Sequence, residues 1–263
     1  MGLPEEITAS LEEGLDDLVE LYRGFHAAPE LSMQEHRTAK AIGKRLESYG
    51  LTPRTVGGTG VVAVIENGEG PVVAFRADTD GLPIEEATGL PYASTASGTL
   101  ADGTTTPVMH GCGHDTHITA GLEIARLLVT HRETWAGTVV LLFQPGEETA
   151  AGAAAMVEDG LWDRVPTPEA VYGQHVWPGV AGTVNVSVGT AMAMADSLRV
   201  TVHGRQAHGS QPENSIDPIV LGAYMITRLQ TVVSREIAGS DMAVLTVGTF
   251  HGGVKENIIP AKA

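Results

Sequence analysis

Four short runs of apolar residues constrain the fold of this 263-residue chain more than any other feature of its sequence. The runs cover residues 61–65, 72–75, 139–143 and 170–172, and most of their residues are Val, Leu or Ala. Such continuous apolar content is typical of strands covered on both faces, as in a mainly parallel sheet flanked by helices. The half-exposed strands of a meander would alternate polar and apolar residues more strictly. The runs therefore predict an α/β fold.

Segments with helical spacing surround these runs. Apolar residues recur at steps of three and four over residues 8–27 and 35–49, and Gly50 follows the second segment, where a helix commonly ends. Residues 118–130, between the second and third runs, also read as a helix. We therefore expect helices to pack against the sheet.

The pattern changes in the last third of the chain. Residues 197–202 alternate polar and apolar like a half-buried strand, residues 215–233 are apolar at helical spacing, and residues 243–247 form another strand-like run. We therefore predict a larger α/β domain over residues 1–184 and a smaller, inserted α+β domain over residues 185–263.

Charge and cysteine content limit the possible partners. The chain has 32 acidic and 16 basic residues, and a formal net charge of -16 argues against nucleic acid and anionic membranes, which attract clustered Lys and Arg. A single cysteine cannot form an internal disulfide and fits a reducing cytosol. The N-terminal segment is acidic, whereas a secretory signal begins with basic residues. These features predict a cytoplasmic protein that acts on small molecules.

Side chains able to bind a metal follow three of the predicted strands. Asp78 and Asp80 come after the second run, Glu147 and Glu148 after the third, and His175 after the fourth. In open α/β sheets, ligands bind outside the carboxyl ends of the strands, so these groups are expected to converge. Taken singly, each has a more ordinary interpretation, as a solvated loop residue or a satisfied histidine.

The segment MHGCGHDTH, residues 109–117, is the richest in metal-binding side chains. It holds the only cysteine, Cys112, and three of the ten histidines. Glycines on both sides of Cys112 permit backbone angles that could turn Cys112 and His114 toward one point. A thiolate and an imidazole suit Zn²⁺, with Mn²⁺, Co²⁺ or Ni²⁺ as alternatives. Two other interpretations remain open: an inert buried thiol, and a nucleophilic Cys112 activated by His114 or His117.

The neighbouring Glu147 and Glu148 favour the metal interpretation over the nucleophile. At the start of a helix, adjacent residues point about 100° apart and can perform different tasks. One carboxylate can bind the metal while the other takes a proton from a metal-activated water. This is the arrangement used in metal-assisted hydrolysis.

Seven motifs together resemble one branch of a known enzyme family. They are, in chain order, RGFHAAPELSMQE, FRADTDGLPI, MHGCGHDTHITAGL, LLFQPGEETAAGAAAMVEDG, GQHVWPG, GRQAHGSQPENSIDP and GTFHGGVKENIIP. In this order they look like the hippurate hydrolase and indole-acetyl-amino-acid hydrolase branch of the di-metal aminoacylase and carboxypeptidase family. The resemblance extends from about Leu18 to the last residues.

The resemblance implies a two-metal amidohydrolase with a catalytic α/β domain and an inserted lid domain that also pairs two subunits. It implies that the metal ligands are Cys112, His114, Glu148 and His175, and that Glu147 is the general base. It also implies that His208 reaches the partner's active site and stabilises the oxyanion there, and that Asn257 binds the substrate. Asp78 and Asp80 become supporting residues rather than ligands in this branch.

The implied reaction is hydrolysis of an N-acyl amino acid, with Arg205 as one candidate to bind the substrate carboxylate. A dipeptidase, carboxypeptidase or deacetylase with the same catalytic groups is the alternative enzyme, and a non-catalytic metal-binding fragment is the alternative from another class. Members of the branch continue past the lid and supply a further histidine ligand. Because four side chains must then serve two ions, we expect this chain to bind at most one ion tightly.

Overall fold

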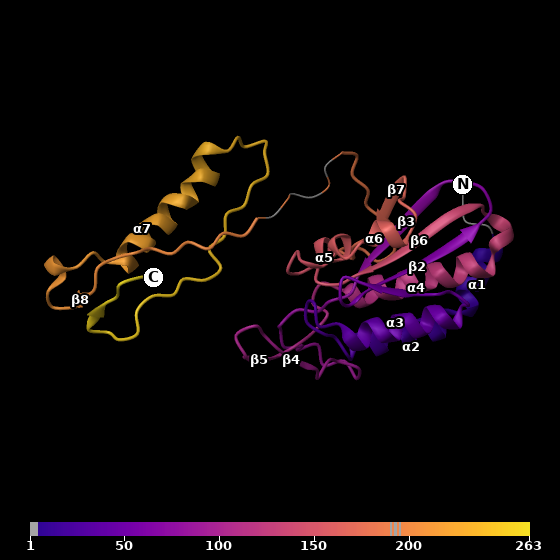
Figure 1. The fold of residues 1–263 in the computed structure, drawn as a ribbon, viewed down its shortest axis with the longest axis horizontal. Helices are drawn as coiled ribbons and strands as arrows, with labels where there is room; N and C mark the ends of the chain where they lie inside the picture. The colour runs from indigo at the N-terminus through magenta and orange to yellow at the C-terminus, as the bar shows by residue number, and fades with distance from the viewer. Residues whose placement is uncertain (1–4, 190, 192–193, 195) are drawn as a thin grey trace. The chain divides into compact units, whose positions relative to one another are not determined.

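The computed structural model describes residues 5–189, 191, 194 and 196–263. The chain divides into two compact units, a first unit of Met1–Gly179 and a second unit of Val180–Ala263. Within the described residues, no helix is long and apolar enough to cross a membrane. The elements of both units are labelled along the chain in Figure 1.

The first unit is built on a five-stranded sheet in the order β1-β2-β6-β3-β7. The strands are β1 (Arg54–Val56), β2 (Gly60–Asn67), β3 (Val72–Asp78), β6 (Gly137–Gln144) and β7 (Ala170–Gly173). All four predicted runs are therefore strands, and the α/β class is confirmed. The sheet is mixed rather than mainly parallel: β3 runs parallel to β6 and β7, but β2 is antiparallel to β6 and β1. A short loop reverses the chain between β2 and β3, and β6 lies between these two strands.

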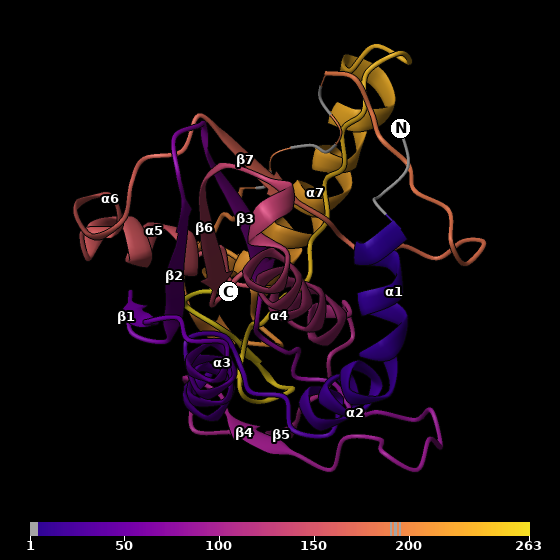
Figure 2. The same cartoon turned by 90° about the vertical axis from the view of Figure 1, so that its right-hand side faces the viewer.

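Helices cover both faces of this sheet (Figure 2). The helices of the first unit are α1 (Glu5–Glu13), α2 (Leu15–His26), α3 (His36–Ser48), α4 (His114–Thr130), α5 (Gly152–Glu158), α6 (Leu161–Arg164) and the 3-10 turn η1 (Arg132–Thr134). Successive strand side chains point to opposite faces. Val61 and Ala63 accordingly pack into the core beneath α2, α3 and α4, whereas Val62 packs with α5 and α6. Burial on both faces explains the continuous apolar runs of β2 and β6, whereas β3 is partly buried and the run in β7 is mostly exposed.

The predicted helices are present, with shifts at their ends. The segment 8–27 breaks at Gly14 into α1 and α2, and Gly50 follows α3 with a φ of 78°. Helix α4 begins at His114, four residues before the predicted start. Its first turn, HDTH, is polar because His114 and His117 face the carboxylates at the end of β3 and Asp115 pairs with His26 of α2, so hydrophobic spacing could not identify it.

A two-stranded hairpin and the second unit complete the fold. The hairpin pairs β4 (Ser97–Thr99) with β5 (Thr105–Pro107). The second unit contains β8 (Ala207–His208), β9 (Ile258–Ile259), the 3-10 turn η2 (Pro212–Asn214), α7 (Pro218–Thr231) and the π-helical turn η3 (Val232–Glu236). Strands β8 and β9 pair in antiparallel register.

The helix predicted over residues 215–233 matches α7, but the two strands predicted beside it are wrong. Residues 197–202 and 243–247 are not assigned to any strand. An alternating pattern gives a segment two faces, yet a strand also needs a neighbour for its N–H and C=O groups. Among residues 197–202 only Val202 has such a neighbour, exchanging two backbone hydrogen bonds with Ala263.

Candidate metal centre

The loop before α4 places Cys112 and His114 at the carboxyl end of β3. Gly113 has a φ of 76°, and a Cβ at this position would lie 2.4 Å from a methyl carbon of Val176. Only glycine fits this turn without rearrangement. His117 follows His114 by three residues, so the two imidazoles project from the same face of α4.

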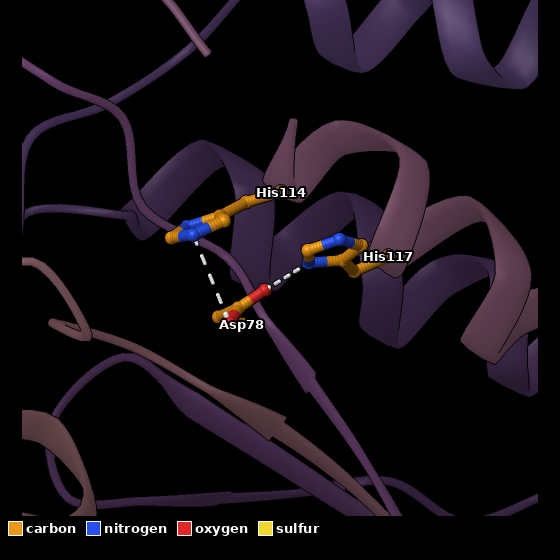
Figure 3. A group of neighbouring side chains, drawn as sticks. All are labelled: Asp78, His114 and His117. Atoms are coloured by element: carbon orange, nitrogen blue, oxygen red, sulfur yellow. Dashed lines mark hydrogen bonds and ion pairs between the residues drawn. The ribbon is translucent and has the colours of Figure 1, made fainter. Parts of the chain in front are cut away.

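Two groups of side chains have the composition and spacing of a metal site. Asp78, His114 and His117 form a fully buried group, and Cys112, His114 and Glu148 form a second group at the same place. In each group the potential ligand atoms lie within 4.8 Å of one another. His114 belongs to both groups. Figure 3 shows Asp78, at the end of β3, between the two imidazoles of α4.

In the buried group, the hydrogen bonds of His117 leave neither ring nitrogen free. Its Nδ1 lies 2.5 Å from an oxygen of Asp78, and its Nε2 accepts a 2.9 Å hydrogen bond from the backbone N–H of Val176. Burial alone would raise the pKa of Asp78, but the hydrogen bond to His117 and the nearby His114 and Arg76 lower it to about 2. Asp78 is therefore an ionised carboxylate that orients His117.

Asp80 supports the site through its neighbours. The backbone C=O of Asp80 lies 2.9 Å from Nδ1 of His114, which fixes the imidazole with Nε2 directed away. The two carboxylate oxygens of Asp80 accept the backbone N–H groups of Glu147 and Glu148, each at 3.1 Å, and Ser32 donates its hydroxyl at 2.6 Å. Burial raises the pKa of Asp80, but its hydrogen bonds, first from His114 and then from Ser32, give a net lowering.

The second group leaves two buried ligand atoms without a hydrogen bond. Nε2 of His114 and Oε1 of Glu148 are buried, have no hydrogen bond among the described residues and lie 3.9 Å apart. This distance is too long for a hydrogen bond. It suits two ligands of one ion, since bonds of about 2.0–2.2 Å to a shared metal place the ligand atoms roughly 3–4 Å apart. The donor set of Cys112, His114 and Glu148 therefore fits a bound divalent ion.

The surroundings of Cys112 are acidic. Burial raises the pKa of this thiol to about 12, with further contributions from a hydrogen bond to Glu148 and the charges of Glu148, Glu147 and Asp78. A thiol activated as a nucleophile has the opposite environment, with a cationic neighbour that lowers its pKa. A divalent cation among these carboxylates would instead favour the thiolate as a ligand.

His175 and Glu147 lie at the edge of the same cluster. The ring centroid of His175 is 4.7 Å from that of His117 and 5.9 Å from that of His114, and His175 is exposed. A carboxylate oxygen of Glu147 lies 3.9 Å from Nε2 of His114, and this side chain is 39% exposed, compared with 18% for Glu148. The structure thus brings together all five candidate residues of the first unit.

The sequence predicted no role for His117 at the metal and named it only as an alternative activator of a nucleophilic Cys112. The spacing of the two histidines could have identified it, because His117 follows His114 by three residues and the two therefore lie on one side of a helix.

His208 and Asn257 belong to the second unit. They are neighbours there, because Gly209, next to His208, donates its backbone N–H to the C=O of Asn257 at 2.8 Å. His208 is exposed, and its Nδ1 lies 2.8 Å from the hydroxyl of Ser210. Arg205 is also exposed and donates to the C=O of Asn214 at 3.0 Å.

Comparison with known proteins identifies the family. Residues 74–255 match the model of peptidase family M20/M25/M40. The match covers both metal-capable groups and most of the second unit. The chain belongs to this family, and the resemblance inferred from the motifs is confirmed.

Individual relatives agree with this assignment. The N-acetyl-L-cysteine deacetylase of Bacillus subtilis (strain 168) is 44% identical over 92% of this chain and 56% of its own length. The hippurate hydrolase of Campylobacter jejuni is 39% identical over 90% of this chain and 59% of its own length. The crystal structure of the Bacillus subtilis YXEP protein, described as a dinuclear metal-binding peptidase from the M20 family, aligns with a TM-score of 0.67 and 35% identity over 94% of this chain and 61% of that chain. The chain spans little more than half the length of the two curated relatives.

Proposed function

We propose that this chain belongs to a metal-dependent amidohydrolase that cleaves N-acyl amino acids in the cytoplasm. Residues 1–184 would form its catalytic domain and residues 185–263 part of a lid and dimerisation domain. The observation that carries the proposal is the pair of buried ligand atoms on His114 and Glu148 that have no hydrogen bond, beside the half-exposed carboxylate of Glu147. The names of the similar deacetylase and hippurate hydrolase support the reaction class.

Cys112, His114 and Glu148 would hold the first ion. The alternative group with His117 is less suitable, because Asp78 and the backbone N–H of Val176 already occupy both nitrogens of His117. Since Nε2 of His114 can bind only one ion, a second ion needs another donor, and His175 is the exposed imidazole nearest to the cluster. The thiolate, imidazole and carboxylate donors suit Zn²⁺ or Mn²⁺, with Co²⁺ or Ni²⁺ as alternatives.

When bound, the divalent ions supply polarisation of the amide carbonyl and a lowered pKa for water. Glu147 then acts as the general base: its carboxylate takes a proton from the attacking water and returns it to the leaving amine. The greater exposure of Glu147 suits this task, because the base must reach water and substrate. Asp80 holds the backbone N–H groups of Glu147 and Glu148, so the base and the ligand keep a fixed separation.

Replacing the cysteine separates the ligand role from the nucleophile role. We expect Cys112→Ser to lose most of its bound metal, because a neutral hydroxyl is a much poorer ligand than a thiolate. In cobalt-loaded wild-type protein, absorption should include a thiolate-to-cobalt charge-transfer band that Cys112→Ser lacks. Mass spectrometry of wild-type protein during turnover should find no acyl group on Cys112. An acyl-Cys112 adduct would make the thiol the nucleophile.

The proposed homodimer gives His208 and Asn257 a role in the partner's site, where His208 would stabilise the developing oxyanion and Asn257 would hold the substrate. Their adjacency across β8 and β9 supports a joint role. The exposed apolar residues of α7, among them Val220, Leu221 and Tyr224, support pairing through this unit.

Mixing two inactive variants tests this arrangement. When His208→Ala and Glu147→Gln subunits are mixed, each hybrid dimer would contain one site with both intact residues, so we expect part of the activity to return. Native mass spectrometry should verify that hybrids form. Hybrids without recovered activity would place His208 in its own subunit's site or outside catalysis.

A deacetylase is the second candidate function, and the 44% identity to the N-acetyl-L-cysteine deacetylase favours it. Rates with acetyl, benzoyl and indole-acetyl amino acids, measured on one metal-loaded sample, distinguish a small acyl pocket from a large aromatic one. Bound metal without hydrolysis of any of these amides would support the non-catalytic alternative.

A further inference from the structure

We propose that Glu35 is a positioning residue, whose buried carboxylate holds the backbone of the loop that carries Glu147 and Glu148. The inference rests on the proposed function, since it concerns the placement of the general base. Glu35 lies immediately before α3 and is separated from the loop by 111 residues of sequence.

Glu35 has no exposed surface, and both of its carboxylate oxygens are hydrogen-bonded. Oε1 accepts the backbone N–H of Gly146 at 2.8 Å and that of Met33 at 2.9 Å. Oε2 accepts the hydroxyl of Thr59 at 2.5 Å. The carboxylate therefore joins three segments: the turn before α3, the turn between β1 and β2, and the loop after β6.

No cation compensates this carboxylate, because none of the ion pairs among the described residues includes Glu35. Burial raises the pKa of Glu35, and only neutral hydrogen-bond donors act against the shift. A buried carboxylate without a cationic partner is costly. In compensation, the Glu35 carboxylate accepts three hydrogen bonds. One of them comes from Gly146, on the loop beside the metal centre.

The loop after β6 is fixed at three consecutive backbone N–H groups. Glu35 accepts the N–H of Gly146, and Asp80 accepts those of Glu147 and Glu148. Gly146 has a φ of 55°, and a Cβ here would lie 2.6 Å from the sulfur of Met33. The hydrogen bond from Gly146 to Glu35 therefore fixes the backbone immediately before Glu147.

This backbone control matters because the side chain of Glu147 has no hydrogen bond within the described part of the chain. Its ion pair among these residues is with Nε2 of His114, at 3.9 Å. The position of the Glu147 carboxylate thus depends on where its backbone lies. A shift of about 1 Å in a catalytic group can cost roughly 10²-fold in rate.

Three variants test the proposal. Glu35→Ala removes the acceptor for Gly146. Glu35→Gln retains it, since the amide oxygen can accept both N–H groups and the amide nitrogen can donate to the Thr59 hydroxyl. Thr59→Ala is the matched control, because it removes the third hydrogen bond of the same carboxylate and leaves the loop contact in place.

Hydrogen–deuterium exchange of the peptide containing Gly146 to Glu148 should accelerate in Glu35→Ala but remain near wild type in Glu35→Gln and Thr59→Ala. With metal-loaded protein, kcat of Glu35→Ala should fall about 10²-fold while KM and bound metal are unchanged. Should Glu35→Ala fail to fold, Glu35→Asp provides the same test, because its shorter side chain withdraws from Gly146.

Three results would overturn the proposal: unchanged exchange of the loop in Glu35→Ala, an equal loss of kcat in Thr59→Ala, or a loss in Glu35→Gln as large as in Glu35→Ala. The first would remove the contact itself. An equal loss of kcat in Thr59→Ala would mean that Glu35 only stabilises the fold. A large loss in Glu35→Gln would mean that the negative charge of Glu35, and not its hydrogen bond to Gly146, determines kcat. If wild-type protein hydrolyses no N-acyl amino acid, the proposed function fails, but the exchange measurement still decides whether Glu35 holds the loop.

Discussion

Glu147→Gln should abolish hydrolysis and leave the bound metal in place. The amide has the shape of the carboxylate but cannot accept a proton from water, and loss of a general base typically costs about 10² to 10⁴ in rate. The metal should remain because Cys112, His114 and Glu148 are unchanged, and the ligand atoms of this group lie within 4.8 Å of one another without Glu147. The measurement is kcat with a set of N-acyl amino acids, together with elemental analysis of the same sample.

The neighbouring carboxylate provides the contrast. Glu148→Gln should lose metal and activity together, because Oε1 of Glu148 is the buried atom that faces Nε2 of His114. The two variants differ by one position in the sequence, so a difference in metal content reports the separate tasks of the two carboxylates. Loss of metal from Glu147→Gln to the same extent as from Glu148→Gln would make Glu147 a ligand as well.

His114→Ala should have the largest effect on metal binding. His114 belongs to both groups of potential ligands, so neither group remains complete without it. Residues that merely orient a metal ligand are worth about 10- to 100-fold in metal affinity, and the loss of a shared ligand should exceed this. Hydrolysis should fall in parallel, since the carbonyl is then no longer polarised. Titration of metal-free protein with Zn²⁺ and with Mn²⁺ measures the affinity.

His131→Ala is the matched control for this variant. His131 caps the opposite end of α4, and its ion pair among the described residues is with Glu133, at 3.6 Å. Removing it changes the same helix by the same substitution but touches neither group of ligands. It should bind metal as wild type does, and thermal unfolding of both variants would show whether α4 remains folded.

Four strands and the helices α1 to α4 of the first unit could be predicted because their signals are local, whereas β1, β4, β5, α5 and α6 were not predicted. The four apolar runs are all strands. Burial on both faces accounts for the runs in β2 and β6, but the edge strand β7 is mostly exposed although its residues are apolar. The order of the strands has no local signal: β6 lies between β2 and β3, and this insertion makes the sheet mixed. The strands predicted over residues 197–202 and 243–247 were wrong for a related reason, because alternation cannot show whether a partner strand is present.

The candidate site was predictable to the extent that its residues lie in short motifs. Cys112 and His114 share one loop, and Glu147 and Glu148 are adjacent. The structure adds the role of His117, which follows from helical spacing. Glu35 could not be found in this way, because its contact with Gly146 arises only when the turn before α3 meets the loop after β6.

We propose that Cys112, His114 and Glu148 hold a divalent ion and that Glu147 acts on the water without binding the ion. The most direct test is the number of metal ions per chain, measured by elemental mass spectrometry on wild type, His114→Ala and Glu147→Gln after identical loading and desalting. We predict that Glu147→Gln retains the wild-type content and that His114→Ala retains almost none. Wild-type metal content in His114→Ala would contradict the account, because the ion would then lie outside both groups of ligands.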